Sequence, residues 1–171
     1  MLFMLFGCSS LLTISIEETA TTTVEGGTVL EDLLGDLGFD EFVTMDLTSS
    51  EELQNQGVEP GDIAESALTL LELSVIEPEG GDLSFLESMA VSVSSPEVAS
   101  VLVAAQDTFP EGVSTVAFDL EDVDLTPYIV SQALSLTTEV SASRPEEDTV
   151  VEARFVLDVT ATVQGLKNQV N

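Results

Sequence analysis

The C-terminal half of the chain alternates apolar and polar residues with a period of two. The longest such run covers residues 151–163, and its apolar positions are Val151, Ala153, Phe155, Leu157, Val159, Ala161 and Val163. Successive side chains of a β-strand point to opposite faces of a sheet, so a run of this kind has one face to bury. It therefore predicts a strand that packs that face against a second layer.

Three earlier runs show the same alternation. Their apolar positions are Leu68, Leu70, Leu73 and Val75; Met89, Val91 and Val93; and Val116, Phe118 and Leu120. Leu71 interrupts the first of these runs, which predicts a bulge. Several strands with one apolar face bury those faces by packing as two sheets. We therefore expect a mainly β protein, an antiparallel Ig-like β-sandwich with one or two short N-terminal helices.

Residues typical of turns separate the runs. Pro, Gly and polar or acidic residues gather at 77–82, 95–97, 109–112 and 143–148. They indicate tight connections between antiparallel strands. The sequence Thr126-Pro127-Tyr128 predicts a single helical turn, with Thr126 as its cap and Pro127 at its first position.

The segment before Asp62 predicts short elements of a different kind. Thr28–Leu37 carries apolar side chains at helical spacing and begins with a capping box, which predicts a helix. A second short helix is expected to begin near Ser49 or Ser50 and to stop at Gly57. Phe42–Leu47, between the two helices, fits an edge strand.

The length of 171 residues fits one domain. We expect residues 1–7 to be a truncated signal peptide or apolar leader, and residues 8–24 to contain a tether and the first strand. Within that segment, Ser9, Ser10 and the Thr-rich stretch Thr19–Thr23 fit the tether. Residues 25–171 are then a single β-sandwich domain with an N-terminal helical portion.

The chain carries 32 acidic residues and three basic ones, Arg144, Arg154 and Lys167, and its net charge is -29. Binding of nucleic acid depends on Lys and Arg that displace the counterions of phosphates, so we expect no nucleic-acid partner. Direct adsorption to anionic lipid head groups is disfavoured for the same reason. The excess of carboxylates also resembles that of proteins from saline habitats, where salt screens repulsion within the folded state. We therefore expect salt to stabilise this protein.

Near the start of the chain, residues 5–10 read Leu5-Phe6-Gly7-Cys8-Ser9-Ser10 after a short apolar segment. The Leu-x-Gly-Cys pattern resembles the lipobox of bacterial envelope lipoproteins. The resemblance implies that Cys8 carries a lipid and anchors the mature protein in the bacterial cell envelope, at the outer membrane or the cell surface. Only seven residues precede Cys8 and none is basic, so the leader is shorter than a complete signal peptide. Alternatively, residues 1–12 form an apolar first strand with a buried free thiol.

Three later stretches support a second resemblance. They are Leu-Ser-Val-Ile-Glu-Pro at 73–78, Phe-Pro-Glu-Gly-Val-Ser-Thr-Val at 109–116 and Asp-Val-Asp-Leu at 122–125. With them, residues 70–163 resemble the β-sandwich of late-embryogenesis-abundant water-stress proteins, although that family has Asn at the position of Glu77. The resemblance implies the fold and a stress-protective or adhesive role, and it assigns no functional residue.

Several catalytic groups are excluded by composition. The chain has no His and a single Cys, so it cannot form a Ser-His-Asp or Cys-His group or the imidazole ligands of catalytic zinc. Carboxylate pairs remain available for glycoside hydrolysis. There is, however, no Trp, and Tyr128 is the only Tyr, which leaves little aromatic surface for stacking on a sugar. We therefore expect a protein that is not an enzyme.

Two acidic clusters are candidates for a metal site, because Ca²⁺ prefers oxygen ligands. The first consists of Asp119, Glu121, Asp122 and Asp124, and the second of Glu146, Glu147 and Asp148. Each is either a weak calcium site or a solvated acidic surface, and no other cofactor is expected. Arg144 precedes the second cluster, where it either pins the loop through paired carboxylates or forms an exposed ion pair of little energy.

The sequence thus predicts a non-enzymatic, lipid-anchored, acidic envelope lipoprotein that acts as a structural, binding or adhesion module. Its expected partners are the membrane, through the lipid on Cys8, and another envelope protein. Two alternatives stay open. One is a soluble stress-protective β-sandwich of the water-stress type, and the other is a weak calcium-binding surface protein.

Overall fold

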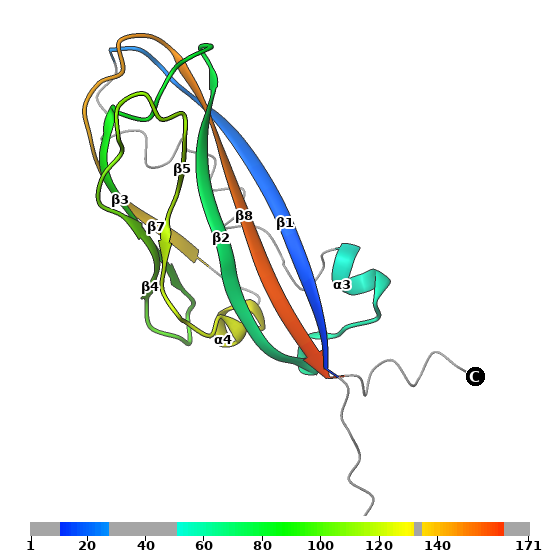
Figure 1. Ribbon diagram of the computed structural model, residues 1–171. Helices are drawn as coiled ribbons and strands as arrows, with labels where there is room; N and C mark the ends of the chain where they lie inside the picture. The colour runs from blue at the N-terminus through cyan, green and yellow to red at the C-terminus, as the bar shows by residue number, and fades with distance from the viewer. Residues whose placement is uncertain (1–10, 28–50, 132–134, 163–171) are drawn as a thin grey trace, which may run out of the picture.

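The computed structural model describes residues 11–27, 51–131 and 135–162. In this part of the chain, eight strands form two antiparallel four-stranded sheets that pack face to face (Figure 1). The first sheet has the strand order β1-β8-β2-β5 and the second has the order β6-β4-β3-β7. The predicted mainly β fold, an antiparallel β-sandwich, is confirmed.

Three long strands build most of the first sheet. The sheet consists of β1 (Leu11–Val24), β8 (Thr149–Thr162), β2 (Ile63–Glu77) and the short β5 (Thr115–Ala117). β8 pairs antiparallel with both β1 and β2. It is also the strand with the longest predicted alternation. Its inward side chains from Val151 to Ala161 are buried, apart from the partly buried Phe155.

The second sheet is shorter and is centred on two adjacent strands. It consists of β3 (Leu86–Ser94), β4 (Val101–Gln106), β6 (Asp119–Leu120) and β7 (Ser135–Ala142). β3 pairs antiparallel with β4 on one side and with β7 on the other. The predicted inward residues Met89, Val91 and Val93 are all buried, so the alternation identified the core-facing side of this strand.

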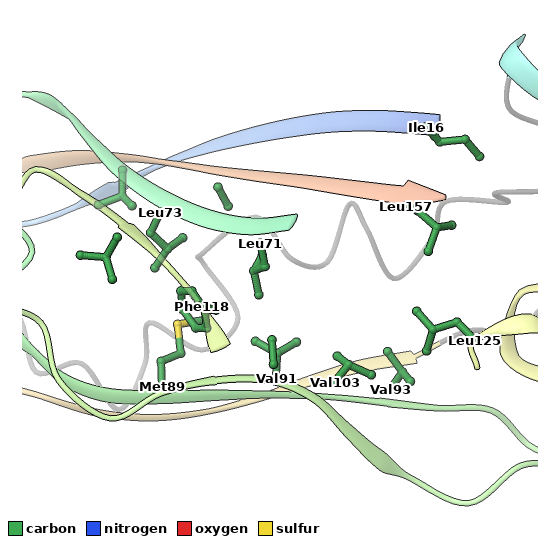
Figure 2. Packing of buried hydrophobic residues seen from close by; sticks show 14 of the residues in the cluster. Ile16, Leu71, Leu73, Met89, Val91, Val93, Val103, Phe118, Leu125 and Leu157 are labelled. Carbon is green, nitrogen blue, oxygen red and sulfur yellow. The ribbon is translucent and has the colours of Figure 1, made fainter. Parts of the chain in front are cut away.

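Apolar side chains of the two sheets meet between the layers (Figure 2). They come from β1 (Ile16), β2 (Leu71, Leu73), β8 (Leu157), β3 (Met89, Val91, Val93) and β4 (Val103), and from Phe118 and Leu125. In the described part of the chain the buried polar residues are Ser66 and Thr149. Both are hydrogen-bonded within the fold, so neither carries an unsatisfied group into the core.

Two of the alternating runs differ in detail from the prediction. The pairing of β2 with β8 shifts between Leu68 and Leu70. This confirms a bulge, but it is Leu71 that is buried, while Leu70 is only partly buried. Residues 115–120 are not one strand, because β5 pairs with β2 in the first sheet and β6 with β4 in the second. The chain crosses between the sheets at Phe118, which stays buried.

The expected Thr-rich tether is wrong for Thr19–Thr23. These residues belong to β1 and pair with residues 150–154 of β8. Thr19, Thr21 and Thr23 are exposed on the outer face of the sheet. Threonine is β-branched and fits such a pleated, half-exposed surface, which explains why the stretch forms a strand.

Short helical elements lie close to the strands. α3 (Glu51–Asn55) confirms the second predicted helix, and Gly57 after it has a φ of 67°, a left-handed conformation that favours glycine. α3 lies beside β1 (Figure 1), and the 3-10 turn η3 (Pro60–Asp62) leads into β2. The predicted helix Thr28–Leu37 and the predicted edge strand Phe42–Leu47 lie outside the described residues.

α4 (Thr126–Ile129) confirms the predicted helical turn, with Pro127 in its first turn. The predicted cap is wrong, because Leu125 is the N-cap residue and Thr126 already lies in the helix. Instead, Asp124 Oδ1 accepts a hydrogen bond from the Thr126 amide at 2.9 Å. The Tyr128 hydroxyl donates to the Ala99 carbonyl at 2.8 Å, which holds α4 against the loop between β3 and β4.

The directions of the strands define two ends of the sandwich. β1 and β2 begin where β8 ends, and we call this the near end because it is the nearer to Cys8 in the sequence. The opposite, far end consists of residues 25–27 and of the loops 78–85, 107–114 and 143–148, in the upper part of Figure 1. β1 has 14 residues, so at ~3.3 Å per residue the two ends are separated by about 45 Å.

Candidate functional site

At the far end, the turn after β1 is bonded to the loop between β7 and β8. The Gly27 amide donates to the Pro145 carbonyl at 3.1 Å, and the Gly26 amide donates to Asp148 Oδ1 at 2.8 Å. The two backbones approach so closely that a Cβ on Gly26 would lie 2.8 Å from the Glu147 Cα. Glycine is therefore the residue that fits this contact.

The loop between β2 and β3 is bonded in turn to the loop between β4 and β5. Asp82 accepts hydrogen bonds from the Ser84 hydroxyl at 2.6 Å, the Gly112 amide at 2.6 Å and the Ser84 amide at 3.0 Å. These hydrogen bonds, of which the one from the Ser84 hydroxyl has the largest effect, hold the pKa of Asp82 below its usual value. The Leu83 amide adds a bond to the Val113 carbonyl at 3.3 Å.

A cavity lies between two of these loops, 78–85 and 143–148. The Ser143 amide donates to the Phe85 carbonyl at 2.6 Å and joins the two loops beside it. The cavity has a volume of about 340 Å³, and its lining comes from residues 78–85 and 143–149. Buried Phe85 and Pro145 give it apolar surface. Its volume lies at the small end of the range of small-molecule sites, and loops on a rigid scaffold often carry binding residues.

The cavity also carries charged side chains that the fold does not use. Arg144, Glu146 and Glu147 line it, are exposed, and make no side-chain hydrogen bond or ion pair with other described residues. Both roles expected of Arg144 are therefore wrong within the described residues, because each required an ion pair. Hydrogen bonds at Ser143, Pro145 and Asp148 hold the loop instead.

The first predicted acidic cluster lies along β6 and the segment that follows it. Asp124 Oδ1 accepts from the amides of Thr126 at 2.9 Å and Ser66 at 3.5 Å. Hydrogen bonding, above all with the Thr126 hydroxyl, lowers the pKa of Asp124 against the opposing effect of desolvation. Asp124 thus ties α4 to β2, while Asp119, Glu121 and Asp122 are exposed.

The structure describes all seven predicted metal ligands and places the second cluster in the far-end loop. Glu146 and Glu147 line the cavity, and Asp148 is bonded to the amide of Gly26. Within the described residues, no group of three or more acidic or Cys side chains is arranged to hold a metal ion. The structure therefore does not bring either cluster together as a set of calcium ligands.

An ion pair that the sequence did not predict lies on the outer face of the first sheet. Arg154 Nε donates to Glu17 Oε1 at 2.7 Å, and the two side chains are 39% and 54% exposed. The hydrogen bond and the charge of Arg154 lower the pKa of Glu17, and the same contacts, with Glu72 and Glu152 nearby, raise the pKa of Arg154. The pair connects β1 to β8, and only the strand register places its members together.

Cys8, the predicted lipidation site, lies outside the described residues, three positions before Leu11 in the sequence. Among the helices of the described ranges, none is long and apolar enough to cross a membrane. A comparison of the chain with protein-family models and with curated proteins gave no match.

Proposed function

We propose that this protein is a non-enzymatic, lipid-anchored module of the bacterial cell envelope that presents its far end as a binding surface. The resemblance of Leu5-Phe6-Gly7-Cys8 to a lipobox supplies the anchor. The observation that supports the proposal is the short distance in the sequence between Cys8 and the first strand of the fold. Leu11, three positions further along, is the first residue of β1 and lies at the near end of the sandwich.

Chain length limits how far the sandwich can stand from its anchor. Three residue steps span at most about 11 Å in an extended chain. A lipid on Cys8 therefore keeps the near end close to the membrane, while the length of β1 carries the far end about 45 Å away. At physiological ionic strength the Debye length is about 8 Å, so the far end lies beyond the field of the head groups.

The charge of the protein supports the same arrangement. With a net charge of -29, anionic head groups repel the body of the protein, and a covalent lipid anchor overcomes this repulsion. Together with an anchor on Cys8, this repulsion favours an orientation in which the near end alone lies at the membrane. The hydrogen-bonded loops and the cavity of the far end then face outward.

Cell fractionation tests the anchor. Expressed from its own gene in its own host, the protein is expected in the membrane fraction, and its N-terminal peptide is expected to gain the mass of acyl chains on Cys8. The variant Cys8→Ser is expected to leave the membrane fraction, while the matched control Ser9→Ala stays there. A wild-type protein with an unmodified thiol in the soluble fraction contradicts the proposal and favours the stress-protective alternative.

A further inference from the structure

We propose that the far-end cavity binds a small zwitterion, a short peptide or amino acid with both a free carboxylate and a free ammonium group. This inference deepens the proposed function, because it rests on the far end being the binding end. It does not depend on the lipid, since every residue that lines the cavity belongs to residues 78–85 or 143–149.

The polar groups around the cavity divide into those that the fold uses and those that it does not. The Ser84 hydroxyl donates to Asp82. The Ser143 hydroxyl donates to the Phe85 carbonyl, and the Thr149 hydroxyl donates to the Glu147 carbonyl. Asp82 itself already accepts from three donors. These groups hold the loops in place, so they have little capacity left for a ligand.

Three charges on the cavity wall remain available. The guanidinium of Arg144 and the carboxylates of Glu146 and Glu147 make no ion pair with other described residues. A guanidinium recognises a carboxylate through two parallel hydrogen bonds, and a carboxylate binds an ammonium group as a charge-assisted acceptor. The wall therefore offers partners for both ends of a zwitterion.

The overall charge decides between a zwitterion and a simple ion. A chain with a net charge of -29 repels a small anion before it reaches Arg144. A simple cation is attracted equally to many acidic places on this surface and leaves Arg144 unused. A neutral ligand with two opposite charges avoids the general repulsion and pairs with both kinds of group, and Phe85 and Pro145 offer apolar contact for its side chains.

The hydrogen bonds of the far end hold these charges in position before a ligand arrives. The loop that carries Arg144 is bonded to Phe85 on one side and to Gly26 and Gly27 on the other, at 2.6 to 3.1 Å. A loop that is already ordered loses little conformational entropy on binding. The three charged side chains are therefore presented by a fixed backbone.

A titration with dipeptides tests the inference. The probe is L-alanyl-L-alanine, added to the full-length protein at low salt and followed by calorimetry and by backbone amide NMR. We expect saturable binding at millimolar concentration, with shifts in residues 78–85 and 143–149. N-acetylation removes the ammonium group of the probe and C-amidation removes its carboxylate, so each blocked probe is expected to bind at least about tenfold more weakly.

Variants locate the site. Arg144→Gln and the double variant Glu146→Gln/Glu147→Gln are each expected to weaken binding at least about tenfold. Their thermal midpoints should stay close to that of the wild type, because these side chains make no hydrogen bond or ion pair with other described residues. Glu97→Gln, the same chemical change in the exposed loop between β3 and β4 at the near end, is expected to leave binding unchanged.

Three results overturn the inference: no saturable binding of the dipeptide, equal binding of the blocked probes, or unchanged binding by Arg144→Gln. Fractionation distinguishes this failure from failure of the anchor. If the protein binds the dipeptide but carries no lipid on Cys8, the zwitterion site is supported and the lipid anchor is contradicted. If the protein carries the lipid but does not bind the dipeptide, only the zwitterion site is contradicted.

Discussion

Individual residues at the far end decide how its loops are joined. Asp82 accepts hydrogen bonds from three donors in two loops. Gly26 allows its own backbone to lie in contact with the backbone of Glu147. Neither residue is part of the hydrophobic core, yet each fixes a contact between segments that are distant in the sequence. Substitutions at these positions therefore test whether the far end is an ordered structure.

Asp82→Ala removes the acceptor that the Ser84 hydroxyl and the Gly112 amide share. Because these hydrogen bonds are close to solvent, we expect a loss of about 1 kcal/mol in the free energy of unfolding. Urea denaturation measures this loss. Asp107→Ala, which removes another exposed carboxylate of the far end, is the control and should leave stability nearly unchanged.

The contribution of Asp82 to the free energy of unfolding should also depend on pH. Its pKa in the folded state is below its usual value, so the unfolded chain binds the proton more tightly. The stabilisation is therefore complete above the unfolded pKa of about 3.9, and it is lost as pH falls through the lower folded pKa. The stability difference between the wild type and Asp82→Ala should be constant near neutral pH and shrink in acid. A difference that grows in acid would contradict this assignment.

Gly26→Ala places a Cβ 2.8 Å from the Glu147 Cα and 2.9 Å from its carbonyl carbon. These are backbone atoms, so one of the two segments must move, and we expect a loss of about 1–3 kcal/mol. Thermal unfolding measures this loss. Gly61→Ala is the matched control, because nothing lies within 4 Å of a Cβ at that position. Equal stability of the two variants would show that the far-end contact is not formed.

At the scale of elements, the main feature is the passage of the chain from one sheet to the other. β5 and β6 belong to different sheets, and Phe118 is the only residue between them. Its ring packs edge-to-face on Phe109, with 6.1 Å between the ring centroids. The crossing is therefore anchored by aromatic packing.

Phe118→Ala should destabilise the protein strongly, because it leaves a cavity at the point where the sheets are joined. We expect a loss of about 3–5 kcal/mol in the free energy of unfolding. Val113→Ala, a truncation in the preceding loop 107–114 at a residue that is 37% exposed, is the control and should cost much less. A loss of similar size in both variants would contradict the role of the crossing.

The crossing shows what alternation can and cannot predict. Val116 and Phe118 are buried and Leu120 partly buried, as predicted, but alternation reports which side chains face the core and not which strand pairs with them. A residue that faces inward keeps doing so when the chain moves to the opposite sheet. The pattern therefore continues through the crossing, and the change of partner cannot be seen in the sequence.

β1 was predicted only in part, for a related reason. Its inward positions include Glu18 and Thr22 as well as Ile14 and Ile16, so the apolar alternation is interrupted.

The far-end site was equally hard to predict. Arg144 and the acidic residues after it were recognised as a charged loop, but the bonds that position this loop go to Phe85 and Gly26, which belong to distant segments.

For the whole molecule, the governing quantity is the charge. The described residues contain one ion pair between side chains, Arg154 with Glu17, so most of the acidic surface is balanced by solvent and counterions alone. Repulsion between the remaining carboxylates destabilises the folded state, and dissolved salt weakens this repulsion by screening it.

Salt should therefore raise the stability of the protein. Thermal unfolding at low NaCl and at molar NaCl is expected to give a higher midpoint in the second condition, since screening acts mostly on the folded state, where the charges are closest. An unchanged or lower midpoint at molar NaCl would contradict the expected self-repulsion.

In the proposed arrangement, the sandwich stands on the membrane by its near end and presents its far end outward. When Cys8 carries the proposed lipid, the single thiol of the chain is blocked, so a fluorescent label can be placed through Gly61→Cys at the near end or Glu147→Cys at the far end. Quenching by a lipid with a head-group quencher then reports the distance of each label from vesicles that carry the protein. We predict strong quenching at position 61 and almost none at position 147. Equal quenching at both positions would contradict this arrangement.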